Sequence, residues 1–320
     1  MESDFSFIRL FRYPIKTIMN YSPLRYPGGK TSLYDFLKKT IKANGITDGT
    51  YVEAFAGGAG AALKLLMLED VHEIYLNDKD EMVYKFWHSI LNHTEEFIQM
   101  IRDCQLNMQE WNYRKQILQN TELRSKLTDL EIGFTTFYLN RCNRSGIIKA
   151  GVIGGNNQNG DWKLDARFNK KDLISKIQKI AYYKERIKIY NLDATKFLKK
   201  IEKEIISKAN MLVYLDPPYV EQGQGLYNVF FMEEDHIKLA KFLQKKSISN
   251  WLVSYDDHPL IHSIYKEVHK NIFEFNYFAN RTKVGRELVI CSKNCKMTTS
   301  YLHYSRAKAL PDLTLDAIAI

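Results

Sequence analysis

The stretch that decides the fold spans residues 211–219 and reads Met211-Leu212-Val213-Tyr214-Leu215-Asp216-Pro217-Pro218-Tyr219. Its first five residues are apolar or aromatic, which predicts a β-strand buried inside a parallel sheet. Two consecutive prolines exclude both a helix and further strand pairing, so the chain must leave the sheet after residue 215. Asp216 therefore falls at the carboxyl end of a strand, the edge at which open α/β sheets bind ligands.

The four residues after this strand offer a carboxylate, a prolyl carbonyl and an aromatic ring. The two kinds of oxygen accept hydrogen bonds from an exocyclic amine, and the ring of Tyr219 can stack on a flat heterocycle. A plain turn is the alternative, because Asp and Pro are common turn residues.

A second informative segment is residues 51–63, with the sequence YVEAFAGGAGAAL. It predicts a strand, a glycine-rich turn and the start of a helix, and such a turn lets backbone N–H groups approach a ligand closely. The glycine spacing fits the dinucleotide fingerprint G-x-G-x-x-G poorly, which disfavours NAD. We therefore expect a nucleoside cofactor beside this turn.

The next predicted strand, residues 73–76, is followed by Asn77 and Asp78. An acidic residue about twenty positions after a glycine-rich turn usually binds the hydroxyl pair of a ribose. The alternative for Asp78 is the N-cap of the next helix, and the spacing favours the ribose role.

Four stretches, in this order, resemble the Dam-type DNA adenine-N6 methyltransferases: LRYPGGK (24–30), EAFAGG (53–58), LND (76–78) and DPPY (216–219). The similarity extends over roughly residues 22–295. It implies a Rossmann-like α/β methyltransferase sheet with helices on both faces and an inserted helical or β-hairpin target-recognition domain. It also implies S-adenosylmethionine (SAM) as the cofactor and a flipped adenine of double-stranded DNA as the substrate.

The resemblance also assigns the site residues. No metal is expected, because methyl transfer from a sulfonium to an amine does not need one. The catalytic residues would be Asp216, Pro217, Pro218 and Tyr219. The cofactor pocket would be lined by residues of all four stretches and of a short motif at residues 190–194: Tyr26, Pro27, Gly28, Gly29, Lys30, Glu53, Phe55, Gly57, Asp78, Asp193 and Asp216.

The residue types of the catalytic motif suit methyl transfer to an amine. The lone pair of adenine N6 is delocalised into the purine ring, so N6 is a poor nucleophile. Hydrogen bonds from N6–H to the Asp216 carboxylate and the Pro217 carbonyl favour a tetrahedral nitrogen, which resembles the transition state. A base inside a duplex cannot reach such a pocket, so it must flip out and stack on Tyr219.

The charge distribution indicates where DNA would bind. The formal net charge is +9, and residues 141–188 hold twelve Lys and Arg against four Asp and Glu. Asn159-Gly160 predicts that residues 151–160 form a β-hairpin or a glycine-rich loop, and the alternation in residues 162–168 predicts a half-buried strand. A solvated basic surface is the alternative to DNA binding. The expected DNA contacts are Arg141, Asn143, Arg144, Lys149, Asn157, Lys163 and Arg167.

The expected organisation is an N-terminal extension (1–21), a catalytic domain in two parts (22–80 and 186–300), a recognition insertion (81–185) and a C-terminal tail (301–320). Helical spacing predicts helices at 82–92 and 94–106, and residues 130–139 are expected to form a buried segment of the same, mainly helical insertion. Apolar runs predict core strands at 251–255 and 287–291.

Three smaller features add further expectations. Residues 221–227 suggest a mobile loop over the flipped base. Asp256 and Asp257 either touch the site or cap the next helix. Further phosphate contacts are expected from Arg281, Lys283 and Arg286.

Composition excludes several classes of protein. No run is long enough for a membrane span and no signal-peptide pattern is present, so we expect a cytoplasmic protein. The four cysteines are expected to be reduced, and His258 and His262 lack the pattern of a metal site. We expect a monomer in solution, and the resemblance leaves open a cognate restriction or defence system as a partner.

Rival functions remain at this stage. Gly29-Lys30-Thr31 resembles part of a P-loop, but Leu24 stands where the first P-loop glycine is required. A SAM-dependent amine methyltransferase of RNA or protein stays open, because the same four-residue motif fits other planar amines. A catalytically silent DNA-binding homologue is a further alternative, and the intact motif at residues 216–219 argues against it. The sequence 144–148 departs from the family's aromatic-glycine pattern, so no recognition sequence is carried over.

Overall fold

The computed structural model describes residues 20–26, 29–205, 210–220, 231–245, 248–266, 268–279 and 281–298. Between residues 269 and 286 the backbone is described without its side chains. Pro27, Gly28 and the loop expected at 221–227 therefore lie outside the described residues, as do the side chains of Arg281, Lys283 and Arg286.

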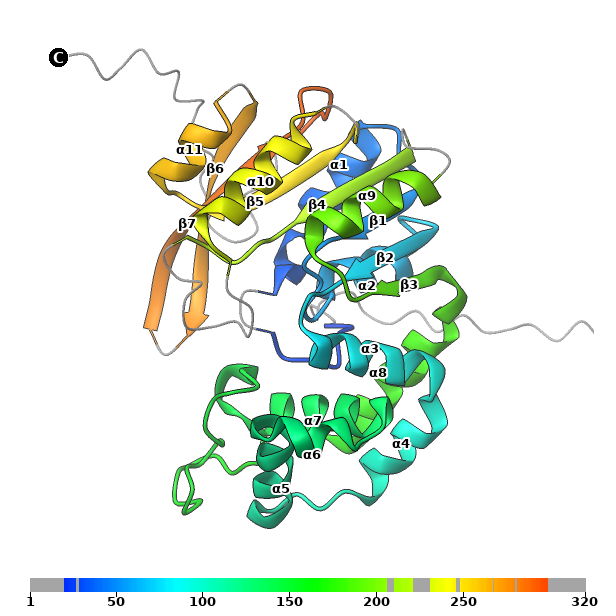
Figure 1. The fold of residues 1–320 in the computed structure, drawn as a ribbon, viewed down its shortest axis with the longest axis vertical. Coiled ribbons are helices and arrows are strands. Elements are labelled where there is room, and N and C mark those ends of the chain that lie inside the picture. Colours follow the sequence, from blue (N-terminus) through cyan, green and yellow to red (C-terminus); the bar gives the residue numbers. More distant parts are fainter. Residues whose placement is uncertain are drawn as a thin grey trace, which may run out of the picture.

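The described residues form seven strands of one sheet, in the order β3-β2-β1-β4-β5-β7-β6 (Figure 1). Strands β1 to β5 are parallel, whereas β7 is antiparallel to both β5 and β6. The strands are β1 (Thr50–Glu53), β2 (Glu73–Asn77), β3 (Ile187–Tyr190), β4 (Met211–Leu215), β5 (Trp251–Asp256), β6 (His269–Ala279) and β7 (Arg281–Cys291). The strands expected in and around residues 51–53, 73–76, 211–215, 251–255 and 287–291 are thus confirmed.

The strand order places a switch point between β1 and β4. From β1 the chain proceeds outward through β2 to β3, and it then returns to place β4 on the other side of β1. Crossover connections leave these two strands toward opposite faces, which opens a crevice at their carboxyl ends. The glycine-rich turn follows β1 and Asp216 follows β4, so both lie at this crevice.

Helices cover both faces of the sheet, as expected (Figure 1). Apolar side chains of α9 (Ala194–Glu204), α10 (Glu233–Leu243) and α11 (Pro259–Ile264) are buried with Val52, Val213 and Val253. On the other face, α1 (Tyr34–Ala43) and α2 (Gly60–Met67) pack with Tyr51, Leu212 and Leu252. Because successive strand residues point to opposite faces, the uniformly apolar β4 is buried on both sides.

Between β2 and β3 the chain inserts six helices, which Figure 1 shows as a layer beside the sheet edge. They are α3 (Glu81–Asn92), α4 (Thr94–Asp103), α5 (Met108–Gln119), α6 (Thr121–Ser125), α7 (Asp129–Cys142) and α8 (Lys170–Tyr182). The helices expected at 82–92 and 94–106 correspond to α3 and α4, and the buried segment expected at 130–139 lies within α7. A capping box starts α7, because Thr128 and Glu131 each accept a hydrogen bond from the other's backbone N–H.

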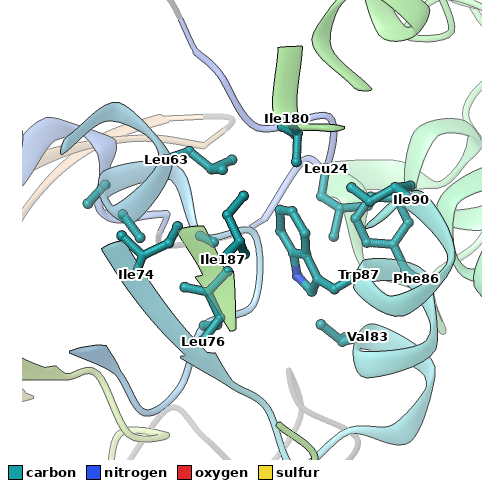
Figure 2. Close-up of a cluster of buried hydrophobic side chains, with 14 of the residues drawn as sticks. Leu24, Leu63, Ile74, Leu76, Val83, Phe86, Trp87, Ile90, Ile180 and Ile187 are labelled. Carbon is teal, nitrogen blue, oxygen red and sulfur yellow. The ribbon is translucent and has the colours of Figure 1, made fainter. Parts of the chain in front are cut away.

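The insertion and the sheet share one hydrophobic core. Figure 2 shows Trp87 of α3 near Ile187 of β3 and Leu24 of the N-terminal segment. Phe86 of α3 and Leu76 of β2 belong to the same cluster. All five side chains are buried. The inserted helices are therefore held against the sheet by a continuous apolar cluster.

The segment between α7 and α8 is a loop of turns, the second of the two forms expected for residues 151–160. A single antiparallel bridge joins Asn143 to Val152. The strand expected at 162–168 was wrong. Local turn bonds, such as those from the N–H groups of Ala166 and Phe168 to the carbonyls three residues earlier, take up backbone groups that a strand ladder needs.

Candidate active site

The side chain of Asp216 stands at the carboxyl end of β4, where Lys30 meets it. Lys30 lies in η1 (Lys30–Leu33), and its Nζ is 2.8 Å from Asp216 Oδ2. The other carboxylate oxygen, Oδ1, is buried and has no hydrogen-bond partner among the described residues. Asp216 thus keeps one oxygen available for a donor that is not part of the described chain.

Glu287 of β7 is a member of this site that the sequence did not indicate. Its Oε1 accepts a 2.7 Å hydrogen bond from the Tyr219 hydroxyl and lies 3.5 Å from Lys30 Nζ. Lys30 also donates to the same hydroxyl at 3.2 Å. Lys30, Asp216, Tyr219 and Glu287 therefore form one connected group of charged and polar side chains.

The position of Glu287 follows from sheet pairing. Strand β7 is antiparallel to β5, and Glu287 pairs with Asp256 at the end of β5. Asp256 in turn accepts a hydrogen bond from the backbone N–H of Val220, the residue after Tyr219. Of the two roles expected for Asp256, the structure shows a contact beside the site. The adjacent α11 has His258 as its N-cap, and Asp257 pairs with His262.

Burial controls the protonation of the acids in the crevice. It raises the pKa of Asp216 to about 6, while the Lys30 ammonium opposes this rise and Glu287 adds to it. Burial, followed by repulsion from Asp216, raises the pKa of Glu53 well above its usual range. Glu53 ends β1, and its Oε2 is a second buried oxygen with no partner among the described residues.

The glycine-rich turn is held in place by Asp78. The backbone N–H of Gly57 donates to Asp78 Oδ2 at 2.8 Å, and Trp87 Nε1 donates to the Gly57 carbonyl at 2.9 Å. Gly57 has a φ of +46°, which favours glycine. The cap interpretation of Asp78 was wrong, because Asp80 is the N-cap of α3. Burial, then repulsion from Asp80, raises the pKa of Asp78 to about 7.

Two aromatic side chains flank this turn. A Cβ on Gly57 would lie 2.6 Å from the Tyr26 ring, so only glycine allows this close approach. Phe55 is partly buried and makes an edge contact with Phe231, with 5.8 Å between ring centroids. Gly29 follows in the same N-terminal segment and donates its N–H to the Tyr26 carbonyl.

Asp193 has a structural function as the N-cap of α9. Its Oδ1 accepts hydrogen bonds from the backbone N–H of Thr195 and of Lys196. The residue begins the helix after β3, and β3 is the strand next to β2. Asp193 therefore lies at the same edge of the sheet as Asp78.

The expected DNA contacts fall into two groups. Arg144, Lys149, Asn157, Lys163 and Arg167 are exposed on the loop between α7 and α8. Asn143 is 1% exposed. Its Oδ1 accepts a hydrogen bond from Trp111 Nε1, and its Nδ2 donates to the carbonyls of Ile147 and Ile148. Arg141 uses its guanidinium to donate to the Arg167 carbonyl. The side chains of both residues therefore donate hydrogen bonds to backbone carbonyls of the loop.

A pair of residues far apart in sequence joins this loop to the crevice. The backbone N–H of Arg25 donates to Asn140 Oδ1 at 2.8 Å, and Asn140 Nδ2 donates to the Arg25 carbonyl at 2.7 Å. Arg25 also donates to the Asn143 carbonyl at 3.1 Å. The segment that carries Tyr26 is thereby fastened to the end of α7.

Residues 26–281 match the family model of the D12 class N6 adenine-specific DNA methyltransferases. The chain is also 24% identical to the Retron Ec67 DNA adenine methylase of Escherichia coli over 292 residues, which cover 89% of this chain and 91% of that protein. In the described part of the chain, every helix is too short or too polar to cross a bilayer.

Two solved structures are similar at low scores. One is a putative RNA methyltransferase, PH1948 from Pyrococcus horikoshii, at 10% identity and a TM-score of 0.37, covering 84% of this chain and 87% of that chain. The other is a SAM-dependent methyltransferase from Agrobacterium tumefaciens, at 9% identity and a TM-score of 0.36, covering 83% and 62%. At TM-scores this low, neither the fold nor the function of this chain is inferred from these two structures.

Proposed function

The chain belongs to the D12 class N6 adenine-specific DNA methyltransferases, and we propose that it transfers a methyl group from SAM to N6 of an adenine flipped out of duplex DNA. The observation that carries the proposal is the position of Asp216. Its buried Oδ1 has no partner among the described residues, and it follows β4 at the switch point of the sheet.

The residues at the crevice fit SAM. When bound, SAM supplies an electrophilic methyl group on a sulfonium centre. The Gly57 turn allows close approach of backbone to a ligand, and Asp78 beside it offers a carboxylate to a ribose. Glu53 Oε2 is a buried acceptor suited to the cationic amino-acid part of the cofactor. Tyr26 and Phe55 supply aromatic surface on either side.

Asp216 and Tyr219 are proposed to hold the target adenine. Asp216 Oδ1 and the Pro217 carbonyl would accept the two N6–H groups, which draws the nitrogen toward the tetrahedral geometry of the transition state. The Tyr219 ring would stack on the base while Glu287 and Lys30 hold its hydroxyl. The carboxylate also stabilises the positive charge that develops on N6.

The insertion of residues 81–185 is proposed to recognise DNA through the loop after α7. Four exposed basic side chains support this: Arg144, Lys149, Lys163 and Arg167. Basic groups on a well-defined loop grip phosphates, and neighbouring amides read base edges. We also propose a cognate restriction or defence system as a partner, and this proposal rests on the family resemblance alone.

The test is transfer of a tritiated methyl group from SAM to duplex DNA of mixed sequence, followed by nucleoside analysis. We expect N6-methyladenine at a defined sequence. Transfer to RNA or protein without transfer to DNA would show that the substrate is a different planar amine. Retained binding of both SAM and DNA without any transfer would show a catalytically silent homologue.

Replacing Asp216 separates catalysis from binding. We expect Asp216→Ala to lower the single-turnover rate of methyl transfer at least about 100-fold, because it removes a group that acts on the developing charge. Its affinity for DNA should stay within a few-fold of wild type. The matched control is Asp35→Asn, an exposed acid on α1. An Asp216→Ala enzyme with the wild-type rate would refute the assigned role.

A further inference from the structure

One tryptophan differs from the other three. Trp87, Trp111 and Trp251 are each 2% exposed, and each indole N–H donates to an acceptor within the chain. Trp162 is 66% exposed, and its indole N–H has no partner among the described residues. An exposed tryptophan places a large apolar ring in water, so it is a candidate contact for a ligand.

The loop that carries Trp162 is held together by internal hydrogen bonds. The side chain of Gln158 donates to the carbonyls of Ile153 and Gly155 at 2.7 Å each and accepts from Leu164 N–H at 2.9 Å. The nearby side chains of Leu164 and Phe168 are buried in the core. The backbone on both sides of Trp162 is thus fixed by internal contacts, and the exposed indole does not result from a lack of local structure.

The backbone of Trp162 also packs closely against the backbone of Gly154. Gly154 has a φ of +85°, and a Cβ there would lie 2.6 Å from the Trp162 carbonyl oxygen. A glycine at this position lets the two backbone segments touch. The backbone that carries the exposed indole is therefore held in one position.

The surroundings of the ring favour a polyanion that carries aromatic bases. The Arg167 guanidinium lies 5.7 Å from the centroid of the Trp162 ring. Lys163 is adjacent, and Arg144 and Lys149 are exposed at the start of the same loop. Asp161 and Asp165 partly offset this charge, which leaves two more basic than acidic residues between positions 144 and 167. Arginine beside an aromatic ring is a common arrangement for stacking on unpaired bases.

We propose that Trp162 stacks on a base of the DNA substrate that becomes accessible when the duplex opens, while Arg167 and Arg144 contact the adjacent phosphates. This inference rests on the proposed function, because flipping of an adenine exposes its unpaired partner and the faces of the neighbouring base pairs. Stacking of this kind changes affinity roughly 5- to 140-fold per base on replacement by alanine.

The first test uses the tryptophan emission of the full chain and iodide as the quencher. Because the other three indoles are buried, iodide should quench the emission of Trp162 and little else. We expect a mixed-sequence duplex carrying one unpaired base to protect this component from iodide. A Trp162→Phe enzyme should lack the component altogether.

The second test is DNA affinity, measured by the fluorescence anisotropy of a labelled duplex with and without the unpaired base. Trp162→Ala should weaken binding to the duplex with the unpaired base more than binding to the intact duplex, and Trp162→Phe should restore part of the loss. Tyr182→Ala is the control, because Tyr182 is 84% exposed but lies at the end of α8. SAM affinity, measured by calorimetry, should not change in these variants.

Two results together would overturn the proposal: iodide quenching that does not change in saturating DNA, and a Trp162→Ala variant with wild-type DNA affinity. The exposed ring would then be a candidate contact for a protein partner. The outcome is separable from that of the proposed function. Methyl transfer with an accessible Trp162 would refute only the stacking role. Protection of Trp162 by DNA without methyl transfer would support stacking and refute only the catalytic proposal.

Discussion

Asp216 is sensitive to pH because it is buried. Burial raises its pKa to about 6, and under the proposed function methyl transfer requires its carboxylate form. The single-turnover rate should therefore fall as pH decreases through about 6, by about tenfold per pH unit well below this value. Rates measured from about pH 5 to 8 with saturating SAM and DNA test this. A flat profile would contradict the role of the carboxylate.

Lys30 provides a second check on the same profile. Its ammonium lies 2.8 Å from Asp216 and lowers the pKa of that acid against the effect of burial. We expect the residual activity of Lys30→Met to have its pH midpoint at a higher value than wild type, because the carboxylate loses its nearest positive charge. A midpoint that moves to lower pH would contradict the ion pair.

Glu287 and Tyr219 should act as one unit. Tyr219→Phe removes the 2.7 Å hydrogen bond between them and Glu287→Gln weakens it, and each change should lower kcat about tenfold. The double variant should lose little more than Tyr219→Phe alone, because both changes act on the same interaction. Additive losses would show that Glu287 acts independently of Tyr219. Glu96→Gln, at an exposed position on α4, is the control.

Sequence and structure agree on the residues that follow strands. Asp216 and Gly57 could be predicted because an apolar run and a turn signal mark the carboxyl end of each strand. Glu287 could not be predicted, because it lies in the run Glu287-Leu288-Val289-Ile290-Cys291, whose pattern indicates only a core strand. Its contact with Tyr219 depends on the register of β7 against β5, which no local pattern contains.

At the scale of elements, the turn between β1 and α2 (Gly60–Met67) is the most sensitive to substitution. Gly57→Ala would add the cost of a positive φ, about 1–2 kcal/mol, and a Cβ 2.6 Å from the Tyr26 ring. We expect SAM affinity to fall at least about tenfold, since the turn and Tyr26 must move apart. Calorimetry measures the affinity, and urea unfolding measures the stability.

Gly45 offers a matched control for this substitution. It also has a positive φ, +68°, but nothing lies within 4 Å of the added Cβ. Gly45→Ala should lose stability from backbone strain and keep wild-type SAM affinity. Equal SAM affinities of the two variants would mean that the contact between the turn and Tyr26 does not shape the cofactor site.

Elements were predicted best where a periodic pattern matched the packing. The helices α3 and α4 followed from their spacing, and β4 from its apolar run. Residues 162–168 show the limit of this reasoning: Leu164 and Phe168 are buried, as a strand pattern suggests, yet turn hydrogen bonds satisfy the backbone. Side-chain burial therefore fitted two backbone conformations, and the pattern could not distinguish them.

At the scale of the whole molecule, the N-terminal segment connects the two parts of the proposed enzyme. Arg25 is fastened to Asn140 of α7, and the next residue, Tyr26, packs on the glycine-rich turn. These partners are separated by 115 positions in the sequence, so their contact was beyond any local pattern. A change on one side of this segment should therefore affect both the cofactor site and the loop.

Gly146 tests this connection. An added Cβ would lie 2.1 Å from the Arg25 carbonyl oxygen, whereas Gly155 has the same φ of +75° and nothing within 4 Å. Gly146→Ala should thus lower the free energy of unfolding more than Gly155→Ala, and it should also weaken SAM binding. Urea unfolding and calorimetry of both variants provide the comparison. Equal losses would show that the contact with Arg25 carries no stability.

In the loop after α7, the residues that anchor the backbone differ from those exposed at its tip. The anchoring contacts, here called the frame, are made by Gln158, Leu164 and the Arg141 guanidinium. The tip carries the exposed residues Asn156 and Asn157. Substitutions at the tip leave the anchoring contacts intact. Under the proposed function, a lineage of such enzymes can acquire a new recognition sequence through tip residues alone, while selection on stability preserves the frame beneath them.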